Sequence, residues 1–362
     1  MDQQNTQIAR YMLSLYPEFE DYETLSRYLE EKCRITGDHF LSEFRSESEY
    51  TPEYTEESRC DVFSEVKEIL TSKNAMFAGY FAGFLVKKYK ALSDAAEASE
   101  ICSDPSAITA DLVTQIYSSL SNIAMRTLIF ELESAKKHDL LKGDTPDERF
   151  RYFRDTLLED EKYVERLHSE YRIMHSQLTE TAGNAMDFAI EMLNNTASHI
   201  NAIRQEIFGG RDMGKLVHIS MSGGDTHVRC RNVSTMIFEN GRLVYKPHSL
   251  KSEAAFQVLL GKLNEHLDEE SRIRLTKIVT EEDYGWTEFI EHTPVSNDGD
   301  AKVFFRKSGI LLALLYICNA TDFHFENVIA SGTDPIPIDL ETLFPLPLYH
   351  ISEPRGSLTA SN

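Results

Sequence analysis

The first two hundred residues carry apolar side chains at three- and four-residue spacings, which is the pattern of amphipathic helices. Residues 8–32 and 111–137 show it most clearly. Pro146 stands where it would open another helix, because proline is well suited to the first helical position. Short apolar runs typical of strands begin after the segment FGGRDMGK at 208–215. We therefore predict an α+β protein, with a mostly helical region over residues 1–208.

A hairpin is predicted around Asn240-Gly241, because this dipeptide favours a type I′ turn between two apolar runs. The expected register sets three pairs opposite each other: Glu239 and Arg242, Phe238 and Leu243, Thr235 and Lys246. Both faces of the second strand carry apolar residues, so Lys246 is expected in a strand covered on each side. An exposed lysine on an edge strand is the alternative.

The segment after this hairpin has a helical apolar stripe of Phe256, Leu260, Leu263 and Leu267. Glu253 lies on the same stripe, one turn earlier. A carboxylate that faces inward needs a cation, and Lys246 is the nearest inward lysine in the sequence. We predict an ion pair between Lys246 and Glu253, with a surface glutamate as the alternative. Kinases use this strand-lysine and helix-glutamate pair to hold ATP phosphates.

Residues 320–342, ATDFHFENVIASGTDPIPIDLET, predict a second hairpin. Apolar runs at 327–330 and 336–338 flank a turn rich in Gly, Asp and Pro, and the nearly all-apolar stretch 304–320 precedes them as a helix. Polar side chains gather before the first strand and after the second. These side chains are Asp322, His324, Asn327, Asp339 and Glu341.

The spacing of these polar residues matches a kinase catalytic loop, in which an Asp base stands five residues before a metal-binding Asn. Asp322 and Asn327 are five apart, and Asp339 follows as a second candidate metal ligand on the next strand. Upstream, Gly223 and Gly224 could cover phosphates with backbone N–H groups. Two alternatives stay open: a polar loop that caps a buried helix, and an iron site that uses Asp322 and His324 with a distant histidine.

Composition narrows the class of protein. Lys plus Arg number 37 and Asp plus Glu number 59, so the net charge of −22 disfavours nucleic acid as a partner. Five scattered cysteines without a CxxC pair indicate a reducing compartment. They are Cys33, Cys60, Cys102, Cys230 and Cys318. The chain has no signal-peptide pattern and no apolar run long enough to cross a bilayer, so we expect a cytoplasmic protein.

Three segments resemble the dehydratase domain of class II lanthipeptide synthetases (LanM type). They are YKPHSL, YGWTEFI and NATDFHFENVIASGTDPIPIDLETLF, and the resemblance runs from about residue 123 to residue 344. It implies a bilobal kinase-like core, similar to lipid kinases, with an N-lobe over 209–292 and the start of an incomplete C-lobe over 293–362. It also implies ATP- and Mg²⁺-dependent phosphorylation of Ser and Thr in a ribosomal precursor peptide. Elimination of the phosphate then leaves dehydroalanine or dehydrobutyrine.

The resemblance also assigns roles to residues. Lys246, supported by Glu253, would hold ATP phosphates, Asp322 would be the base, and His324 would support the catalytic loop. Asn327 and Asp339 would bind Mg²⁺, Glu341 matches an acidic position beside them, and Asp225 and His227 match positions tied to elimination.

The chain departs from the family pattern at Cys230-Arg231 and at His248. It also ends at Asn362, before the family's activation segment and zinc cyclase, so an incomplete fragment with little activity of its own is expected. Two other functions remain possible: a phosphotransferase without lyase activity, and a peptide-binding remnant that is not an enzyme.

Overall fold

The computed structural model describes residues 19, 21–30, 36, 56–223, 231–321 and 323–343. The chain divides into two compact units, Met1–Glu56 and Glu57–Asn362. In the first unit, helix α2 (Tyr22–Tyr28) begins after Asp21, whose carboxylate accepts a hydrogen bond from the Thr24 N–H at 2.9 Å. This helix falls within the helical stretch predicted for residues 8–32.

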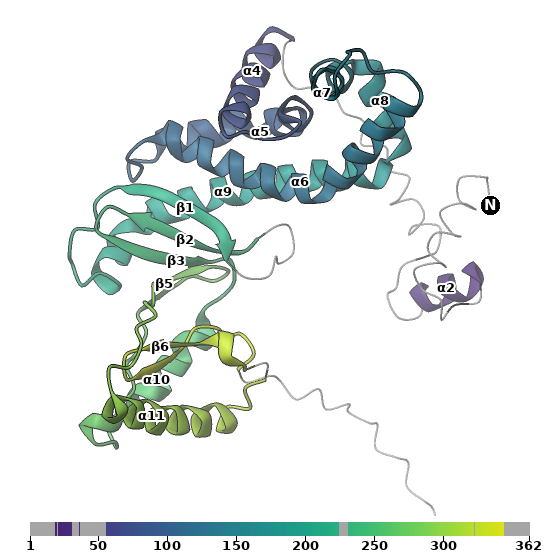
Figure 1. Ribbon diagram of the computed structural model, residues 1–362. Coiled ribbons are helices and arrows are strands. Elements are labelled where there is room, and N and C mark those ends of the chain that lie inside the picture. Colours follow the sequence, from purple (N-terminus) through teal and green to yellow (C-terminus); the bar gives the residue numbers. More distant parts are fainter. Residues whose placement is uncertain are drawn as a thin grey trace, which may run out of the picture. The chain divides into compact units, whose positions relative to one another are not determined.

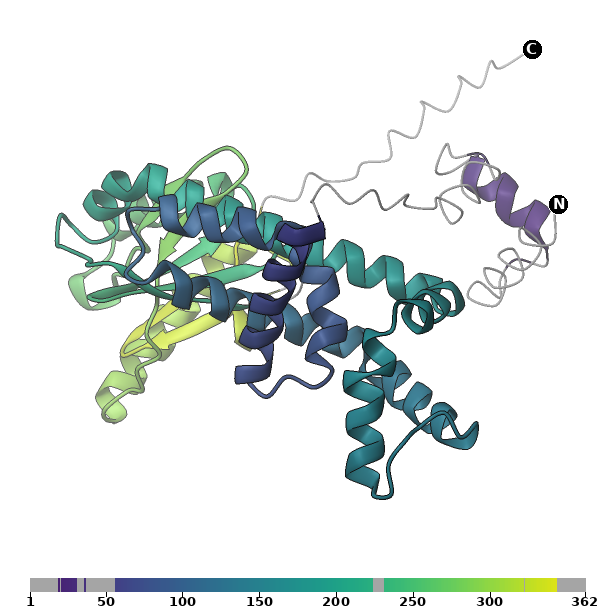
Figure 2. The same cartoon turned by 90° about the horizontal axis from the view of Figure 1, so that it is seen from above.

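The second unit begins with the predicted helices. They are α4 (Glu56–Ser72), α5 (Ala78–Ala98), α6 (Pro105–Lys137), α7 (Pro146–Asp155), the 3₁₀ turn η2 (Leu157–Glu159), α8 (Glu161–Glu170) and α9 (Arg172–Glu206). Pro146 opens α7 as expected, and Thr145 and Glu148 form a reciprocal capping box there. Helices α5, α6 and α9 pack against one another (Figure 2). Among the described residues, no helix is long and apolar enough to span a membrane.

An antiparallel sheet follows the helices, which confirms the α+β prediction. Its strands are β1 (Leu216–Gly223), β2 (Val233–Phe238), β3 (Gly241–Lys246), β4 (Ile278–Thr280) and β5 (Gly285–Glu288), in the order β1-β2-β3-β5-β4. Helices and sheet share one buried apolar cluster, which includes Leu92, Leu193, Tyr245 and Trp286. Burial of this common core holds the strand that carries Lys246 against the helices.

The hairpin of β2 and β3 forms, but the predicted register is wrong. Phe238 pairs with Gly241 and Thr235 with Val244, so the turn consists of Glu239 and Asn240. Neither Glu239 nor Asn240 has a positive φ, so the turn is not type I′. Tertiary contacts determine the position of the turn. The N–H groups of Glu239 and Asn240 donate to the carbonyls of Lys215 and Met213, and Gly241 packs against Phe208 too closely for a Cβ.

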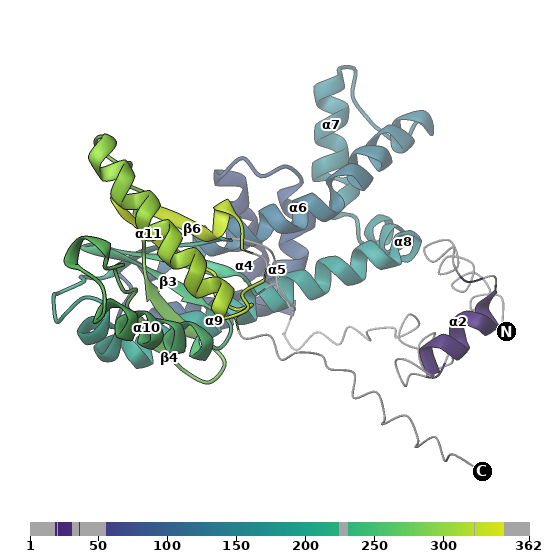
Figure 3. The same ribbon diagram turned by 90° about the horizontal axis from the view of Figure 1, so that it is seen from below.

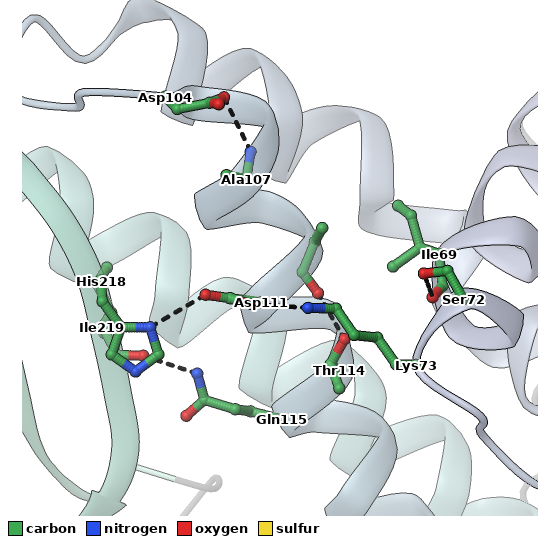
Figure 4. A network of polar contacts seen from close by, with 11 residues as sticks. Ile69, Ser72, Lys73, Asp104, Ala107, Asp111, Thr114, Gln115, His218 and Ile219 are labelled. Atoms are coloured by element: carbon green, nitrogen blue, oxygen red, sulfur yellow. Dashed lines mark hydrogen bonds and ion pairs between the residues drawn. The ribbon is translucent and has the colours of Figure 1, made fainter.

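Helix α6 covers the open edge of β1 (Figure 4). The Gln115 side chain donates to the Ile219 carbonyl at 2.7 Å and accepts from the Met221 N–H at 2.8 Å. This amide therefore takes the place of a neighbouring strand, and such protection is needed because an open edge invites pairing with other chains. Next to it, Asp111 binds His218 Nδ1 at 3.1 Å and Lys73 at 3.6 Å.

A second, smaller apolar cluster organises the C-terminal part, whose helices and strands are drawn in green and yellow in Figure 3. Its elements are α10 (Lys251–Asn264), η4 (Glu269–Ser271), α11 (Asp298–Ile317), η5 (Phe325–Asn327), β6 (Val328–Ser331) and β7 (Asp334–Pro337). Phe256 and Leu260 of α10 pack in this cluster with Leu311 and Leu315 of α11. The predicted stripe thus faces a core, although α10 ends before Leu267.

Candidate functional site

Lys246 and Glu253 form the predicted ion pair. The Lys246 Nζ lies 2.9 Å from Glu253 Oε1, and their side chains are only 7% and 5% exposed. Lys246 is the last residue of β3, and Glu253 lies in the first turn of α10. Two charges removed from water in this way need each other, since either one alone would be buried without compensation. Both alternatives, the edge lysine and the surface glutamate, are wrong.

The space around Lys246 depends on the strand beside it. Gly285 of β5 lies opposite Lys246, and a Cβ at Gly285 would come within 2.7 Å of the Val279 carbonyl oxygen and within 2.6 Å of Leu250. Glycine therefore permits the close approach of β5 and the chain that enters α10. That approach sets the end of β3 beside the first turn of α10, where Glu253 lies.

Lys246 also connects to the second hairpin. Its Nζ donates a hydrogen bond to the carbonyl of Ile338, which is the residue directly before Asp339. The sequence separation between these two residues is 92 positions. The fold thus brings the strand lysine, the helix glutamate and the chain beside Asp339 to one place.

The hairpin of β6 and β7 forms where it was predicted. Val328 pairs with Pro337, and Gly332 takes a positive φ of 62° in the turn. The Ile338 N–H donates to the Asn327 carbonyl at 3.1 Å, which extends the pairing by one step. Because the strands are antiparallel, the start of β6 and the end of β7 are the same end of the hairpin. Asn327 and Asp339 therefore flank that end together.

The chain around His324 is partly described. His324 is exposed, and its Nδ1 lies 3.3 Å from the Glu326 N–H at the start of η5. The Thr342 hydroxyl donates to the Thr321 carbonyl, which ties the segment after Asp339 to the segment before His324. Glu341, in the same segment, is exposed.

Other candidates fall wholly or partly outside the described residues. Asp322, Gly224, Asp225 and His227 lie outside them. Gly223 closes strand β1 and pairs with Val233 of β2. The predicted base and the predicted elimination pair therefore remain predictions.

Sequence reasoning missed a second ion pair, which is partly buried and lies at the turn end of the β6–β7 hairpin. Lys307 of α11 lies 2.8 Å from Asp334 at the start of β7, and the Lys307 side chain is 8% exposed. The sequence did indicate a buried lysine, because Lys307 falls within the nearly all-apolar stretch 304–320. A lysine in such a helix needs a partner.

A shallow groove of about 620 Å³ runs along α11 to the predicted catalytic loop. Its lining residues include Leu312 and Tyr316 of α11 and His324 and Phe325 of the loop. Its wall is mostly apolar, and Leu312, Tyr316 and Phe325 are largely exposed.

The residues at the open end of the hairpin fit a hard cation bound to phosphate. Asn327 and Asp339 offer amide and carboxylate oxygens, and Mg²⁺ prefers one or two such protein ligands together with substrate phosphates. Within the described ranges, no group of three or more His, Cys, Asp or Glu side chains could hold a metal by itself. The Lys246 ammonium group is of the charge that would suit the phosphates of ATP.

Comparison with known proteins identifies the family to which the chain belongs. Residues 171–361 match the family described as "Domain of unknown function (DUF4135)", and the chain belongs to this family. The resemblance to class II lanthipeptide synthetases of the LanM type is confirmed.

The relative that supports this is the lacticin 481/lactococcin biosynthesis protein LcnDR2 of Lactococcus lactis subsp. lactis. It is 25% identical over 238 residues, which is 64% of this chain and 25% of that protein. The chain thus matches about a quarter of the relative's length.

Proposed function

We propose that this chain carries a kinase-like dehydratase site for lanthipeptide biosynthesis. The sheet with α10 would form the N-lobe, and α11 with the second hairpin would begin the C-lobe. The observation that carries the proposal is the buried Lys246–Glu253 pair, because Lys246 also binds the carbonyl next to Asp339. Kinases need a strand lysine, a helix glutamate and a metal-binding aspartate close together to position ATP.

In this proposal, each described residue has a distinct task. Lys246 neutralises the α- and β-phosphates of ATP, and Glu253 holds the lysine side chain in place. Asn327 and Asp339 supply oxygen ligands for Mg²⁺, with Glu341 nearby as an acidic neighbour. Mg²⁺, when bound, neutralises the charge on the transferring phosphoryl group.

The base and the elimination step rest on the resemblance to the family. Asp322 would accept the proton of a Ser or Thr hydroxyl as the hydroxyl oxygen bonds to the γ-phosphorus of ATP, and ADP would leave with the electrons of the broken P–O bond. His324 would support the loop. His227, oriented by Asp225, would then remove the α-proton of the phosphorylated residue. The electron pair released forms the Cα–Cβ double bond, and phosphate leaves with the electrons of the C–O bond. The substrate is a ribosomal precursor peptide.

A phosphotransferase without lyase activity is the second candidate. The roles proposed for Lys246, Glu253, Asn327 and Asp339 concern ATP and Mg²⁺ alone, so phosphoryl transfer needs neither of the residues proposed for elimination, Asp225 and His227. The peptide-binding remnant requires none of these residues to bind nucleotide.

Calorimetric titration of the chain with Mg·ATP tests the proposal. We expect binding by the wild-type chain and its loss in Lys246→Met. Lys262→Met is the matched control, because Lys262 is an exposed lysine on α10. Equal binding by Lys246→Met and the control removes Lys246 from the site. Absence of Mg·ATP binding by the wild-type chain contradicts both enzyme candidates and leaves the peptide-binding remnant.

A further inference from the structure

The hairpin that carries Asn327 and Asp339 has little support of its own. Its two strands have four residues each, and an isolated two-stranded hairpin is at best marginally stable in water. Contacts from outside the hairpin must therefore set its position. Lys246 contacts the hairpin beside Asp339, and further contacts lie at the turn end, opposite to Asn327 and Asp339.

The Asp334 carboxylate is the centre of one set of contacts. Its Oδ1 accepts from the Lys307 Nζ at 2.8 Å and from the Arg274 backbone N–H at 3.0 Å. The Arg274 guanidinium in turn pairs with Glu288 of β5. Glu288 also accepts from the Lys277 N–H at 3.0 Å, and its side chain is only 13% exposed. A polar chain thus runs from the sheet through Arg274 and Asp334 to α11.

Thr293 supplies a second set of contacts. Its N–H donates to the Ala330 carbonyl at 2.9 Å, and its own carbonyl accepts from the Gly332 N–H at 2.9 Å. These backbone bonds hold Thr293, in the segment between β5 and α11, beside β6. They do not involve Lys307, so removal of Lys307 leaves the hairpin attached at this place.

We propose that Lys307 and Asp334 are positioning residues for the nucleotide and metal site. This inference rests on the proposed function. Glu288 of β5 pairs with Leu243 of β3, and β3 ends in Lys246. The polar chain from Glu288 to Lys307 therefore fixes the hairpin relative to the strand that holds the ATP phosphates. It sets where Asn327 and Asp339 lie with respect to Lys246.

The chemistry of the pair supports a positioning role. Replacement of a buried ion pair by neutral side chains of similar size is often neutral or stabilising, because the charges no longer lose their water. A hydrogen-bonded pair, however, has a preferred direction and distance, which apolar contacts lack. Displacement of a reacting group by about 1 Å can reduce a rate on the order of 10²-fold.

The test is the double variant Lys307→Met/Asp334→Asn in the full chain. It removes both charges, and Asn keeps an acceptor for the Arg274 N–H. Arg306→Gln/Glu270→Gln is the matched control, because it removes an exposed ion pair from the next position of α11. Thermal unfolding, ATP affinity without metal and ATP affinity with Mg²⁺ are measured for all three proteins.

We expect the midpoint of unfolding of the double variant to stay within a few degrees of the wild type. Affinity for metal-free ATP should be unchanged, because Lys246 and Glu253 are intact. The factor by which Mg²⁺ strengthens ATP binding should fall about tenfold, the lower end of the loss caused by removing groups that orient metal ligands, because Lys307 and Asp334 act on Asn327 and Asp339 through the hairpin. The control should show the wild-type factor.

The outcomes separate the two proposals. If the wild-type chain binds no ATP, the proposed function fails and this inference falls with it. If the wild type binds Mg·ATP and the double variant keeps the same Mg²⁺ factor, only the positioning role is overturned. Should the double variant fail to fold, Lys307→Gln/Asp334→Asn, which keeps a neutral hydrogen bond, is measured by the same criterion.

Discussion

Lys246 Nζ donates a hydrogen bond to the carbonyl of Ile338, across 92 residues of sequence. The contact places the end of β3 directly beside the chain that enters Asp339. Since the same ammonium group also donates to Glu253 at 2.9 Å, the lysine joins three elements that are separate in the sequence. The first two predictions follow from this junction.

Variants of the Lys246–Glu253 pair separate stability from binding. Lys246→Met leaves Glu253 buried without a cation, so the free energy of unfolding should fall by about 3–5 kcal/mol. Lys246→Met/Glu253→Leu removes both charges and should recover most of that loss, as measured by urea unfolding. Affinity for Mg·ATP should be absent from both variants. Recovery of ATP binding by the double variant would show that the lysine serves only the fold.

Asp339→Asn tests the proposed role of Asp339 as a metal ligand. The substitution preserves shape, so unfolding should resemble that of the wild type, while the dependence of ATP binding on Mg²⁺ should be lost. Transfer of labelled phosphate to a precursor peptide should fall by on the order of 10²-fold, the usual size for removal of one electrostatic group at a reacting centre. Glu282→Gln, in an exposed loop, is the control. Undiminished Mg²⁺ dependence in Asp339→Asn would remove this carboxylate from the site.

His227→Ala distinguishes a dehydratase from a plain kinase. Proton abstraction and phosphoryl transfer need different groups, so elimination should fail while phosphorylation continues. In a lanthipeptide synthetase that contains this chain, peptide should accumulate about 80 Da heavier per modified residue, the mass of an added phosphoryl group. Mass spectrometry measures this directly. Dehydrated peptide, about 18 Da lighter per residue, would assign the elimination step to another group.

Gln115→Ala tests the protection of the β1 edge. The variant leaves the Ile219 carbonyl and the Met221 N–H without the partners they have here, at a cost of about 1–3 kcal/mol. Gln115→Glu keeps the acceptor for Met221 but loses the donor to Ile219, so its free energy of unfolding should be intermediate. Ser118→Ala, on an exposed part of α6, should leave stability unchanged. Equal stability of all three variants would contradict a role for Gln115 at this edge.

Stability should depend on pH through the stacked pair His168 and His175, whose ring centroids lie 4.1 Å apart. Burial, with His175 as a secondary cause, lowers the pKa of His168 from 6.5 to about 4, and burial also lowers the pKa of His175. The unfolded chain therefore binds protons that the folded chain does not, as pH falls from 6.5 toward 4. Folding should lose stability in this window and not above it.

The pair's contribution is measured by urea unfolding of the wild type and of His168→Gln/His175→Gln at pH 7 and pH 5. Any stability advantage of the wild type should shrink at pH 5, because only the wild type must keep these two imidazoles neutral. Tyr80 and Phe84, which pack on the pair, stay uncharged in this range. A difference that is the same at both pH values would contradict the prediction.

Local patterns in the sequence determined the helices, both hairpins and the partner of Lys246. The Lys246–Glu253 pair could be predicted because the two residues are only seven positions apart, and a carboxylate on a buried stripe has few cations within reach. The grouping of Asn327 and Asp339 followed from the geometry of one antiparallel hairpin. Each of these predictions needed only neighbouring residues and the periodicity of one element.

The tertiary structure decided what neighbouring residues cannot. The β2–β3 turn moved by one residue, because Glu239 and Asn240 bind the Met213–Lys215 segment and Gly241 packs on Phe208. The bond from Lys246 to Ile338 and the pair of Lys307 with Asp334 likewise join segments 92 and 27 residues apart. Contacts of this kind leave no periodic pattern, since they arise only when separate elements meet in a shared core. The sequence thus contained the candidate ligands, and the packing of sheet, hairpin and α11 brought the chain beside Asp339 to Lys246.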